Sequence, residues 1–413
     1  MKMRNLMALA LAACTTGAIA AWAGEDSQAF EKIERGRYLA VLGDCIGCHT
    51  APGGKPFAGG AALETPFGAL VGPNITPDVA TGIGAWSVED FHRAMHEGIG
   101  RDGARLYPAM PYPAYTKVTR DDVSAIWAYL RSLDPVRNEV QPNQLRFPFN
   151  VRRPATSTWD LINFTPGVFQ PDPAKSDVWN RGAYLVEGLG HCGTCHTPKN
   201  ITGGDRGGEA LQGALLQDWY APDLTEDPRT GIGSWSIEDI VRYLKTGANS
   251  YDIASGPMAE AVSNSTSKMT DGDLLAIATY LKDRAPRGGR AVTAALASAD
   301  PRMVAGQAIY EDRCAGCHSH SGAGVPTLFP RLASAPLVQS ADPTSLIRVV
   351  LIGNRAVATS AAPTAPAMPA FGWNLNDREI ADVLTYVRNT WGNAASAVQP
   401  EDVTRLRGRL QSR

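Results

Sequence analysis

The 413-residue sequence lacks an excess of charge of either sign. Its 39 Lys and Arg residues are balanced by 41 Asp and Glu residues, which gives a formal net charge of −2. A broad basic surface is therefore absent, and we expect no nucleic-acid partner. After residue 23 the sequence also lacks an apolar run long enough to span a membrane, and it shows almost no strand-like alternation. These absences predict a globular and mainly helical protein.

The first 23 residues predict an export signal. Lys2 and Arg4 precede an apolar run, and Ala21 and Ala23 form an A-x-A cleavage pattern. Two alternatives stay open: Cys14 ends a "LAAC" box that resembles a lipoprotein cleavage site, and the apolar run is just long enough to remain as an uncleaved anchor. In each case we expect an exported chain.

Cysteine is scarce, and nearly all of it is patterned. The chain has seven cysteines, and apart from Cys14 they form three Cys-x-x-Cys pairs, each followed directly by histidine. Structural disulfides rarely show this arrangement. The residues concerned are Cys45, Cys48 and His49; Cys192, Cys195 and His196; and Cys314, Cys317 and His318.

Cys-x-x-Cys-His is the attachment sequence of c-type haem. Two cysteines on one helical turn reach the two vinyl groups of the porphyrin, and the next histidine reaches the iron. Zinc needs four ligands from neighbouring pairs, whereas the first cysteines of these pairs are 147 and 122 residues apart. A thioredoxin-like redox pair needs a βαβ context that the sequence lacks. We therefore predict three covalently bound c-type haems with His49, His196 and His318 as proximal ligands.

The repeat extends well beyond the cysteines. "RGRYLAVLGDCIGCHT" from Arg35 matches "RGAYLVEGLGHCGTCHT" from Arg181, and "NITPDVATGIGAWSVEDF" from Asn74 matches "DLTEDPRTGIGSWSIEDI" from Asp223. These matches predict a duplicated module. A shorter third module opens with "AGQAIYEDRCAGCHS" and lacks the T-G-I-G-x-W signature. Each module ends in a segment with apolar residues at helical spacing.

Proline density marks the connection between the first two modules. Seven prolines in residues 134–177 predict a long irregular linker without regular helix, whose aromatic residues pack on the modules. In the tail, Val403, Leu406 and Leu410 are spaced for a short amphipathic helix that either rests on a membrane or partner or remains solvated. The expected segments are a signal peptide (1–23), module 1 (24–133), the Pro-rich linker (134–177), module 2 (178–284), a second linker (285–300), module 3 (301–392) and a tail (393–413).

Methionine is the first candidate for the sixth iron ligand, because a thioether stabilises ferrous iron. Each module has one methionine in a glycine- or proline-flanked segment that we expect to form a loop ahead of the last helix. These residues are Met110, Met258 and Met368. We expect structural roles for Met95 and Met269, which lie in apolar patterns.

The remaining histidines are weaker candidates for a site. His92 and His96 are four residues apart on one helix face and would need a third partner to hold a metal. His191 and His320 flank the haem motifs, and we expect them at the surface.

Supporting contacts for the haems are also expected. A backbone carbonyl near Pro52 or Pro198 would hold the second imidazole nitrogen of the preceding histidine. Trp86, Trp235 and Asn74 are candidate hydrogen-bond donors to haem propionates, although a packing role fits the tryptophans equally well.

The runs "RGRYLAVLGDCIGCHTAPGG", "TGIGAWS" and "WNRGAYLVEGLGHCGTCHTPKN" closely resemble the triheme cytochrome c subunits of membrane-bound periplasmic dehydrogenases, the family of the alcohol, gluconate, sorbitol and fructose dehydrogenase cytochrome subunits. The resemblance covers nearly the whole mature chain. It implies an all-α fold of three tandem cytochrome c domains joined by long irregular linkers. Two features depart from the family's pattern: Asp223 replaces the asparagine of module 1, and the tail lacks a hydrophobic anchor.

The same resemblance implies a function without a catalytic site in this chain. At the periplasmic face of the bacterial inner membrane, the protein would accept electrons from a dehydrogenase catalytic subunit that carries a flavin or quinone cofactor. It would deliver them to ubiquinone or a terminal oxidase. An independent multihaem carrier or oxidase subunit is one alternative, and a haem enzyme with one labile iron ligand is another.

Overall fold

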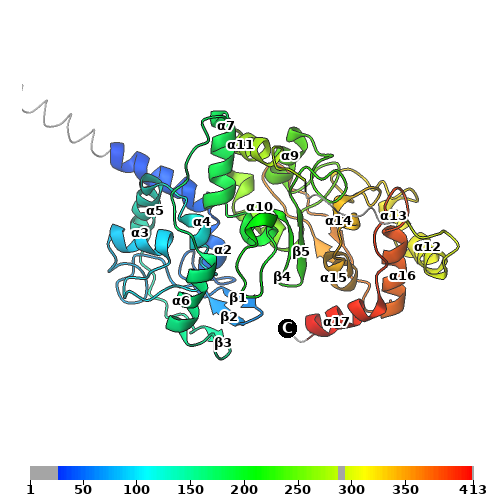
Figure 1. Cartoon of the computed structure of the whole chain (residues 1–413), viewed down its shortest axis with the longest axis horizontal. Coiled ribbons are helices and arrows are strands. Elements are labelled where there is room, and N and C mark those ends of the chain that lie inside the picture. The colour runs from blue at the N-terminus through cyan, green and yellow to red at the C-terminus, as the bar shows by residue number, and fades with distance from the viewer. Residues whose placement is uncertain (1–26, 287–293, 412–413) are drawn as a thin grey trace, which may run out of the picture.

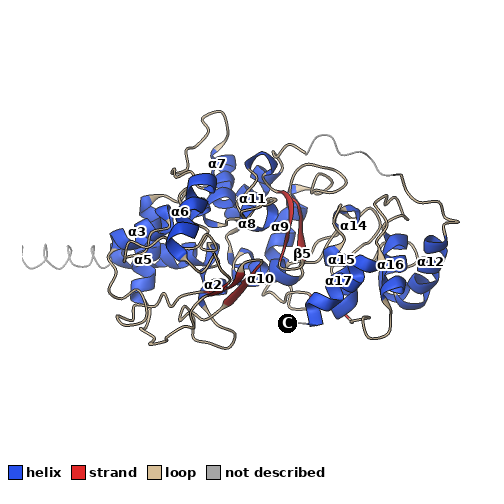
Figure 2. Cartoon of the chain, turned by 60° about the horizontal axis from the view of Figure 1, so that its bottom comes forward, coloured by secondary structure: helices blue, strands red, loops and turns tan. Residues whose placement is uncertain are grey.

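The computed structural model describes residues 27–286 and 294–411, and over these residues the chain is mainly helical (Figure 2). The predicted helical fold is thereby confirmed. The expected signal peptide and Cys14 lie outside the described residues. In Figure 1 the modules follow one another along the molecule, from blue at one end through green to orange at the other. Within the described ranges, no helix has the length and apolar character needed to cross a membrane.

A crossing of the first and last helix forms the frame of each module. The three crossings pair residues 27–42 with α5 (Arg120–Ser132), α7 (Asp177–Tyr184) with α11 (Asp271–Leu281), and α12 (Pro301–Arg313) with α16 (Asp377–Val387).

A glycine lies at every one of these crossings. A Cβ added to Gly182 would lie 1.9 Å from the carbonyl oxygen of Ala276, and one added to Gly306 would lie 2.2 Å from that of Asp382. Gly36 is in the same position in module 1. The helices can approach this closely only because these positions carry no side chain.

The repeated T-G-I-G-x-W-S segments lead into two equivalent helices, α3 (Val88–Glu97) and α9 (Ile237–Thr246). Ser87 and Ser236 form capping boxes with the acidic residue three positions later, and a left-handed glycine ends each helix. The shorter helices are α2 (Cys45–His49), α4 (Tyr112–Tyr115), η1 (Leu185–Leu189), α8 (Gly193–His196), η2 (Gly207–Glu209), α10 (Gly256–Asn264), η3 (Thr266–Lys268), α13 (Ala315–His318), α14 (Pro336–Gln339) and α15 (Thr344–Ile352).

In residues 27–286 and 294–411 the structure contains three small antiparallel sheets, which the sequence pattern does not predict. Their strands have only two to five residues, which is too short for alternation to stand out in the sequence. The sheets contain β1 (Ala62–Thr65), β2 (Gly68–Val71) and β3 (Gln144–Leu145); β4 (Gln212–Leu216) and β5 (Trp219–Asp223); and β6 (Asn354–Arg355) and β7 (Ala367–Met368).

The prediction of no regular helix in residues 134–177 is wrong. Helix α6 (Arg152–Asn163) lies in this linker, and Pro154 is accommodated because it is the third residue of the helix, where the backbone N–H has no helical partner. The predicted packing of linker aromatics is confirmed for Trp159, whose Nε1 donates to Thr202 O at 3.0 Å. It is wrong for Phe147, which is 80% exposed.

The predicted tail helix is present as α17 (Pro400–Gln411), and its apolar face is covered by module 3. Val403 and Leu406 are buried in a core shared with α15 and α16. Arg407 fixes the helix by donating to Leu375 O at 3.0 Å and to Asp377 Oδ1 at 2.7 Å. This face therefore rests on the protein's own surface and not on a membrane or partner.

Modules 1 and 2 share one hydrophobic core, whereas module 3 has a separate one. The shared core joins Leu39 and Leu42 of the first helix to Leu185 and Leu189 of η1. The separate core of module 3 is centred on α16 and includes the tail helix.

Candidate haem-binding sites

Each Cys-x-x-Cys-His motif forms a single helical turn at the end of a longer helix. The turns are α2, α8 and α13, and a helical turn places residues three positions apart on one face. All six cysteines of the motifs are free, and Cys48 and Cys317 are exposed. This is the geometry that two thioether bonds to one edge of a porphyrin require.

The three motif histidines are all held by the same contact. The Nδ1 atom of the motif histidine lies 2.8 Å from Pro73 O in module 1, 2.7 Å from Pro222 O in module 2 and 2.9 Å from Pro330 O in module 3. A carbonyl partner requires Nδ1 to carry the proton, so the other ring nitrogen, Nε2, is left with its lone pair for a metal.

The expectation that the carbonyls belong to residues near Pro52 or Pro198 is wrong. The accepting prolines lie 24, 26 and 12 residues after their histidines. Sequence spacing could not identify them, because the loops between histidine and proline differ in length. In modules 1 and 2, a hairpin of two strands brings the proline back to the histidine.

Burial favours the neutral form of the motif side chains. It lowers the pKa of the His49, His196 and His318 imidazoles. It raises the pKa of Cys45 and Cys192 to about 12. Reactive redox thiols have lowered pKa values, so the thioredoxin-like alternative fits this chain poorly. Neutral imidazoles are the form that ligates iron.

The three candidate methionines are half-buried, but only Met110 lies in a loop as predicted. Met258 lies in the first turn of α10, because Pro257 is favourable at a helix start. Met368 ends the short strand β7. Met95 and Met269 are 3% exposed in the core, which confirms the structural role expected for them.

Among the expected propionate donors, Trp235 fits and Asn74 does not. The Nε1 atom of Trp235 is buried and has no hydrogen-bond partner among the described residues, as expected of a donor whose acceptor belongs to a haem. Asn74 already uses its amide group within module 1, since Nδ2 donates to Thr81 Oγ1 at 3.0 Å and to Val136 O at 2.7 Å. Trp86 is half-buried against the shared core.

The histidines outside the motifs differ in their surroundings. His92 and His96 stack with ring centroids 4.1 Å apart, but in the described ranges no three His, Cys, Asp or Glu side chains are grouped to hold a metal. The prediction that His191 lies at the surface is wrong. Its side chain is half-buried and stacks on the ring of Tyr115. His320 is exposed as predicted.

Modules 1 and 2 meet through a reciprocal exchange of tyrosines. Tyr38 of module 1 donates to Asp273 Oδ2 of module 2 at 2.8 Å, and Tyr184 of module 2 donates to Asp122 Oδ2 of module 1 at 2.6 Å. The two tyrosines are equivalent in the repeat, as are the two aspartates. Their repetition in the sequence was a signal, but only the structure shows that each pair joins two modules.

This exchange brings the two haem motifs toward each other. Helix α2 with the first motif contacts α10, which carries Met258, and α4, which follows Met110, contacts η1, which leads to the second motif. Asp44, directly before Cys45, lies in the same junction. Its burial, together with the nearby charge of Glu260, raises the pKa of this carboxyl to about 7.

Known proteins match this chain in sequence over most of its length. A family profile described as cytochrome c matches residues 33–134 and 303–391. The gluconate 2-dehydrogenase cytochrome c subunit of Pantoea cypripedii is 40% identical over 98% of this chain and 95% of its own length. The alcohol dehydrogenase (quinone) cytochrome c subunit of Gluconobacter oxydans is 41% identical over 91% and 82%, and the fructose dehydrogenase cytochrome subunit of Gluconobacter japonicus is 38% identical over 91% and 82%.

Proposed function

Because this chain belongs to the family of dehydrogenase cytochrome c subunits, we propose that it is the electron-transfer subunit of a dehydrogenase complex. Membership implies covalently bound c-type haem. It also implies an electron-transfer role, because haem iron passes single electrons between its ferrous and ferric forms. The finer points below are proposals.

We propose three haems, one in each module. The observation that carries this number is the histidine contact, since all three motif histidines bond a proline carbonyl through Nδ1 and keep Nε2 available. A Cys-x-x-Cys-His motif that did not bind haem would not require this orientation of its histidine. The proposed attachment residues are Cys45, Cys48, Cys192, Cys195, Cys314 and Cys317, the proposed proximal ligands are His49, His196 and His318, and the proposed distal ligands are Met110, Met258 and Met368.

In the proposed ligand sets, a histidine and a methionine would hold each iron and would leave no position open for a substrate. Substrate chemistry at iron needs an open position, so this arrangement suits electron transfer and leaves substrate oxidation to another subunit. The relatives named above are cytochrome subunits of dehydrogenases for gluconate, alcohol and fructose. The partner proposed here is a catalytic subunit with a flavin or quinone cofactor.

The proposed setting is the periplasmic face of the bacterial inner membrane. The export signal expected at residues 1–23 supports it, because c-type haem proteins of this kind are exported before use. From there electrons would pass to ubiquinone or a terminal oxidase. We propose that electrons pass between the haems of the modules. The tyrosine exchange between modules 1 and 2 supports a close pair of haems there. Module 3 contacts module 2 through other residues, such as Arg229 and Gln339.

Reduction by substrate tests this function. The haem-loaded chain purified alone should stay ferric when alcohols, sugars or sugar acids are added, because it holds no substrate site. With the copurifying catalytic subunit present, the substrate of that subunit should reduce the haems, as followed by the visible absorption spectrum. Substrate oxidation by the chain alone, or purification from its source without any dehydrogenase, would contradict the proposal.

A further inference from the structure

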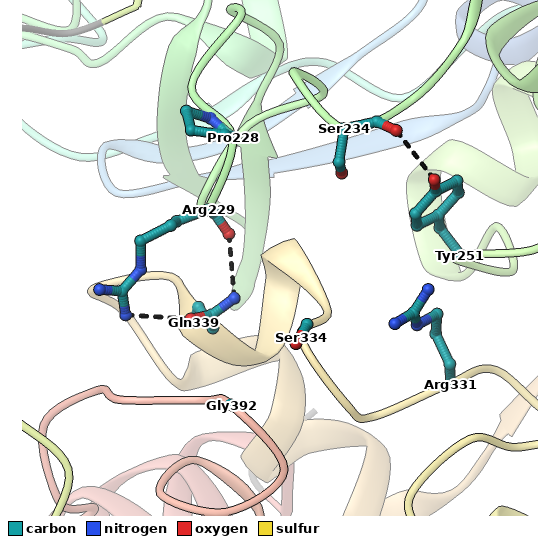
Figure 3. Close-up of a pocket in the computed structure, with 8 residues that line it drawn as sticks. All are labelled: Pro228, Arg229, Ser234, Tyr251, Arg331, Ser334, Gln339 and Gly392. Carbon is teal, nitrogen blue, oxygen red and sulfur yellow. Dashed lines mark hydrogen bonds between the residues drawn. The ribbon is translucent and has the colours of Figure 1, made fainter.

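A cavity of about 490 Å³ lies between modules 2 and 3 (Figure 3). It is large enough for a small ligand. Module 2 contributes one wall and module 3 contributes the other. The lining residues are Pro228, Arg229, Ser234, Tyr251, Arg331, Ser334, Gln339 and Gly392.

The lining is cationic. It contains two arginines and no carboxylate. Arg229 joins the modules by donating to Gln339 Oε1 at 3.0 Å and to Ala394 O at 2.9 Å. The carboxylate beside the lining is that of Asp227, whose Oδ1 accepts from the backbone N–H of Arg229 at 2.9 Å. The two guanidinium groups of the lining itself supply positive charge that an anion would relieve.

Arg331 has unused hydrogen-bonding capacity. Its Nε donates to Ala333 O at 2.9 Å, and its guanidinium lies over the ring of Tyr251 at 5.3 Å from the centroid. In the described part of the chain, its two terminal nitrogens have no hydrogen-bond acceptor. Figure 3 shows the guanidinium pointing into the cavity toward Tyr251. A planar guanidinium held in this way is suited to an oxyanion.

Trp235 neighbours this cavity without lining it. It stacks on the ring of Tyr251 with centroids 5.6 Å apart, and among the described residues its buried Nε1 has no hydrogen-bond partner. A buried donor left unpaired in this way points to an acceptor that the chain itself does not provide.

Both arginines depart from the repeated pattern. Arg229 stands where module 1 has Ala80 in the aligned T-G-I-G segments. Arg331 follows Pro330, the carbonyl partner of His318, whereas Asn74 and Asp223 follow the corresponding prolines and are buried. Two independent substitutions that meet at one junction indicate a role specific to that junction.

We propose that this junction binds an oxyanion, a carboxylate or phosphate group held by Arg331, with Arg229 adding positive charge. Two sources supply this chemistry. One is a propionate of a haem in module 2 or 3, which rests on the proposed function. The other is a free anion from solution, which does not.

The test uses the haem-loaded full chain and the variants Arg331→Gln and Arg229→Gln. Arg137→Gln serves as the matched control. The Arg137 side chain is 75% exposed, and its ion pair with Glu139 is long, at 3.9 Å. Two readouts are needed: the thermal midpoint as inorganic phosphate is added, and the midpoint potential of each haem between pH 5 and 8. Absorbance measures haem content in every variant.

If the ligand is a free anion, added phosphate should raise the thermal unfolding midpoint of the wild-type chain and of the control until the site is saturated. The apparent affinity for phosphate should be at least tenfold weaker in Arg331→Gln. A propionate predicts no phosphate effect. Instead, one haem of Arg331→Gln should have a lower potential, because a positive charge that opposed ferric iron is gone, and its pH dependence should move to higher pH.

Identical phosphate responses and identical potentials in Arg331→Gln and the control would overturn the proposal. If Arg331→Gln fails to mature, Arg331→Lys keeps the charge but not the planar fork, and it should show the same changes in part. A wild-type chain with fewer than three haems would contradict the proposed function, while the phosphate readout would still decide the free-anion case.

Discussion

At the scale of single residues, one hydrogen bond is common to all three candidate haem sites. In each module a proline carbonyl accepts from the motif histidine, at distances between 2.7 and 2.9 Å. The motif residues could be predicted from the sequence because the chemistry of haem attachment fixes their spacing. The carbonyl partners could not, since their distance along the chain depends on loops of different length.

Arg388 is a second residue that the sequence did not single out. It is fully buried in module 3 and donates to Ser396 O, Val338 O and Ser340 O at 2.9 to 3.0 Å. Burial lowers its pKa to about 10, so it is still charged at neutral pH. The backbone carbonyls compensate for the burial of this charge.

Replacement of Arg388 by methionine should therefore destabilise module 3. The change leaves three buried carbonyls without donors, at a cost of about 3 kcal/mol or more in the free energy of unfolding. Guanidinium unfolding measures the change. Arg313→Met, at a half-exposed arginine of α12, is the control, and we expect less than about 0.5 kcal/mol for it. Equal effects of the two changes would contradict this role of Arg388.

His96 should make the stability of module 1 depend on pH. Burial, and then the neighbouring His92, lower its pKa to about 4 from an ordinary value of 6.5. The unfolded state therefore binds this proton more readily, and stability contributed by the neutral imidazole is lost as the pH falls from about 6.5 to 4. His96→Gln should lose less stability over this range, in unfolding measured at pH 7 and pH 4. An unchanged acid loss would rule out this contribution.

The aligned helices explain why His96 is kept neutral. Module 2 has Lys245 at this position, which donates to Met269 O at 2.9 Å and pairs with Asp271 at 3.2 Å. Module 1 has Arg120 where module 2 has Asp271. A neutral side chain therefore replaces the cation where the neighbouring charge is reversed, which supports a structural role for His96.

Helices were easier to predict than the segments between them. The last helix of each module follows from its apolar spacing and polar cap, and the tail helix from Val403 and Leu406. Helix α6 is not predicted because the density of seven prolines in residues 134–177 argues against regular helix, whereas a proline in the first turn, such as Pro154, is compatible with one. The strands and the place of Met258 on a helix depend on contacts between distant segments, which spacing does not reveal.

Replacement by alanine should have opposite effects on stability at two glycines of the third module and the tail: Gly306 at the helix crossing and Gly408 in α17. Gly306→Ala should lower the free energy of unfolding by at least about 2 kcal/mol, because the new Cβ would meet the backbone of α16. Gly408→Ala in α17 meets no atom within 4 Å and should raise it by about 0.5 to 1 kcal/mol. Guanidinium unfolding of both variants tests this, and a tolerated Gly306→Ala would contradict the close crossing.

For the whole molecule, the two hydrophobic cores predict two unfolding units. Modules 1 and 2 share one core and exchange tyrosines, so they should unfold together, and module 3 should unfold separately. Differential scanning calorimetry should resolve two transitions. Arg388→Met should lower only the transition of module 3.

The tyrosine exchange provides the complementary change. Tyr38→Phe removes the hydrogen bond to Asp273 and the one accepted from Thr270 N, and Tyr184→Phe removes those to Asp122 and from Thr119 N. Each should destabilise the unit of modules 1 and 2 by at least about 1.5 kcal/mol. The transition of module 3 should not move. Three separate transitions in the wild-type protein would contradict a shared unit.

Haem stoichiometry tests the central claim most directly. The account predicts that the intact mass of the mature protein equals that of the processed chain plus three haems. Replacing both cysteines of any one motif by alanine should remove one haem and leave two. A wild-type mass with two haems or fewer, or a motif whose cysteines can be replaced without loss of a haem, would contradict the account.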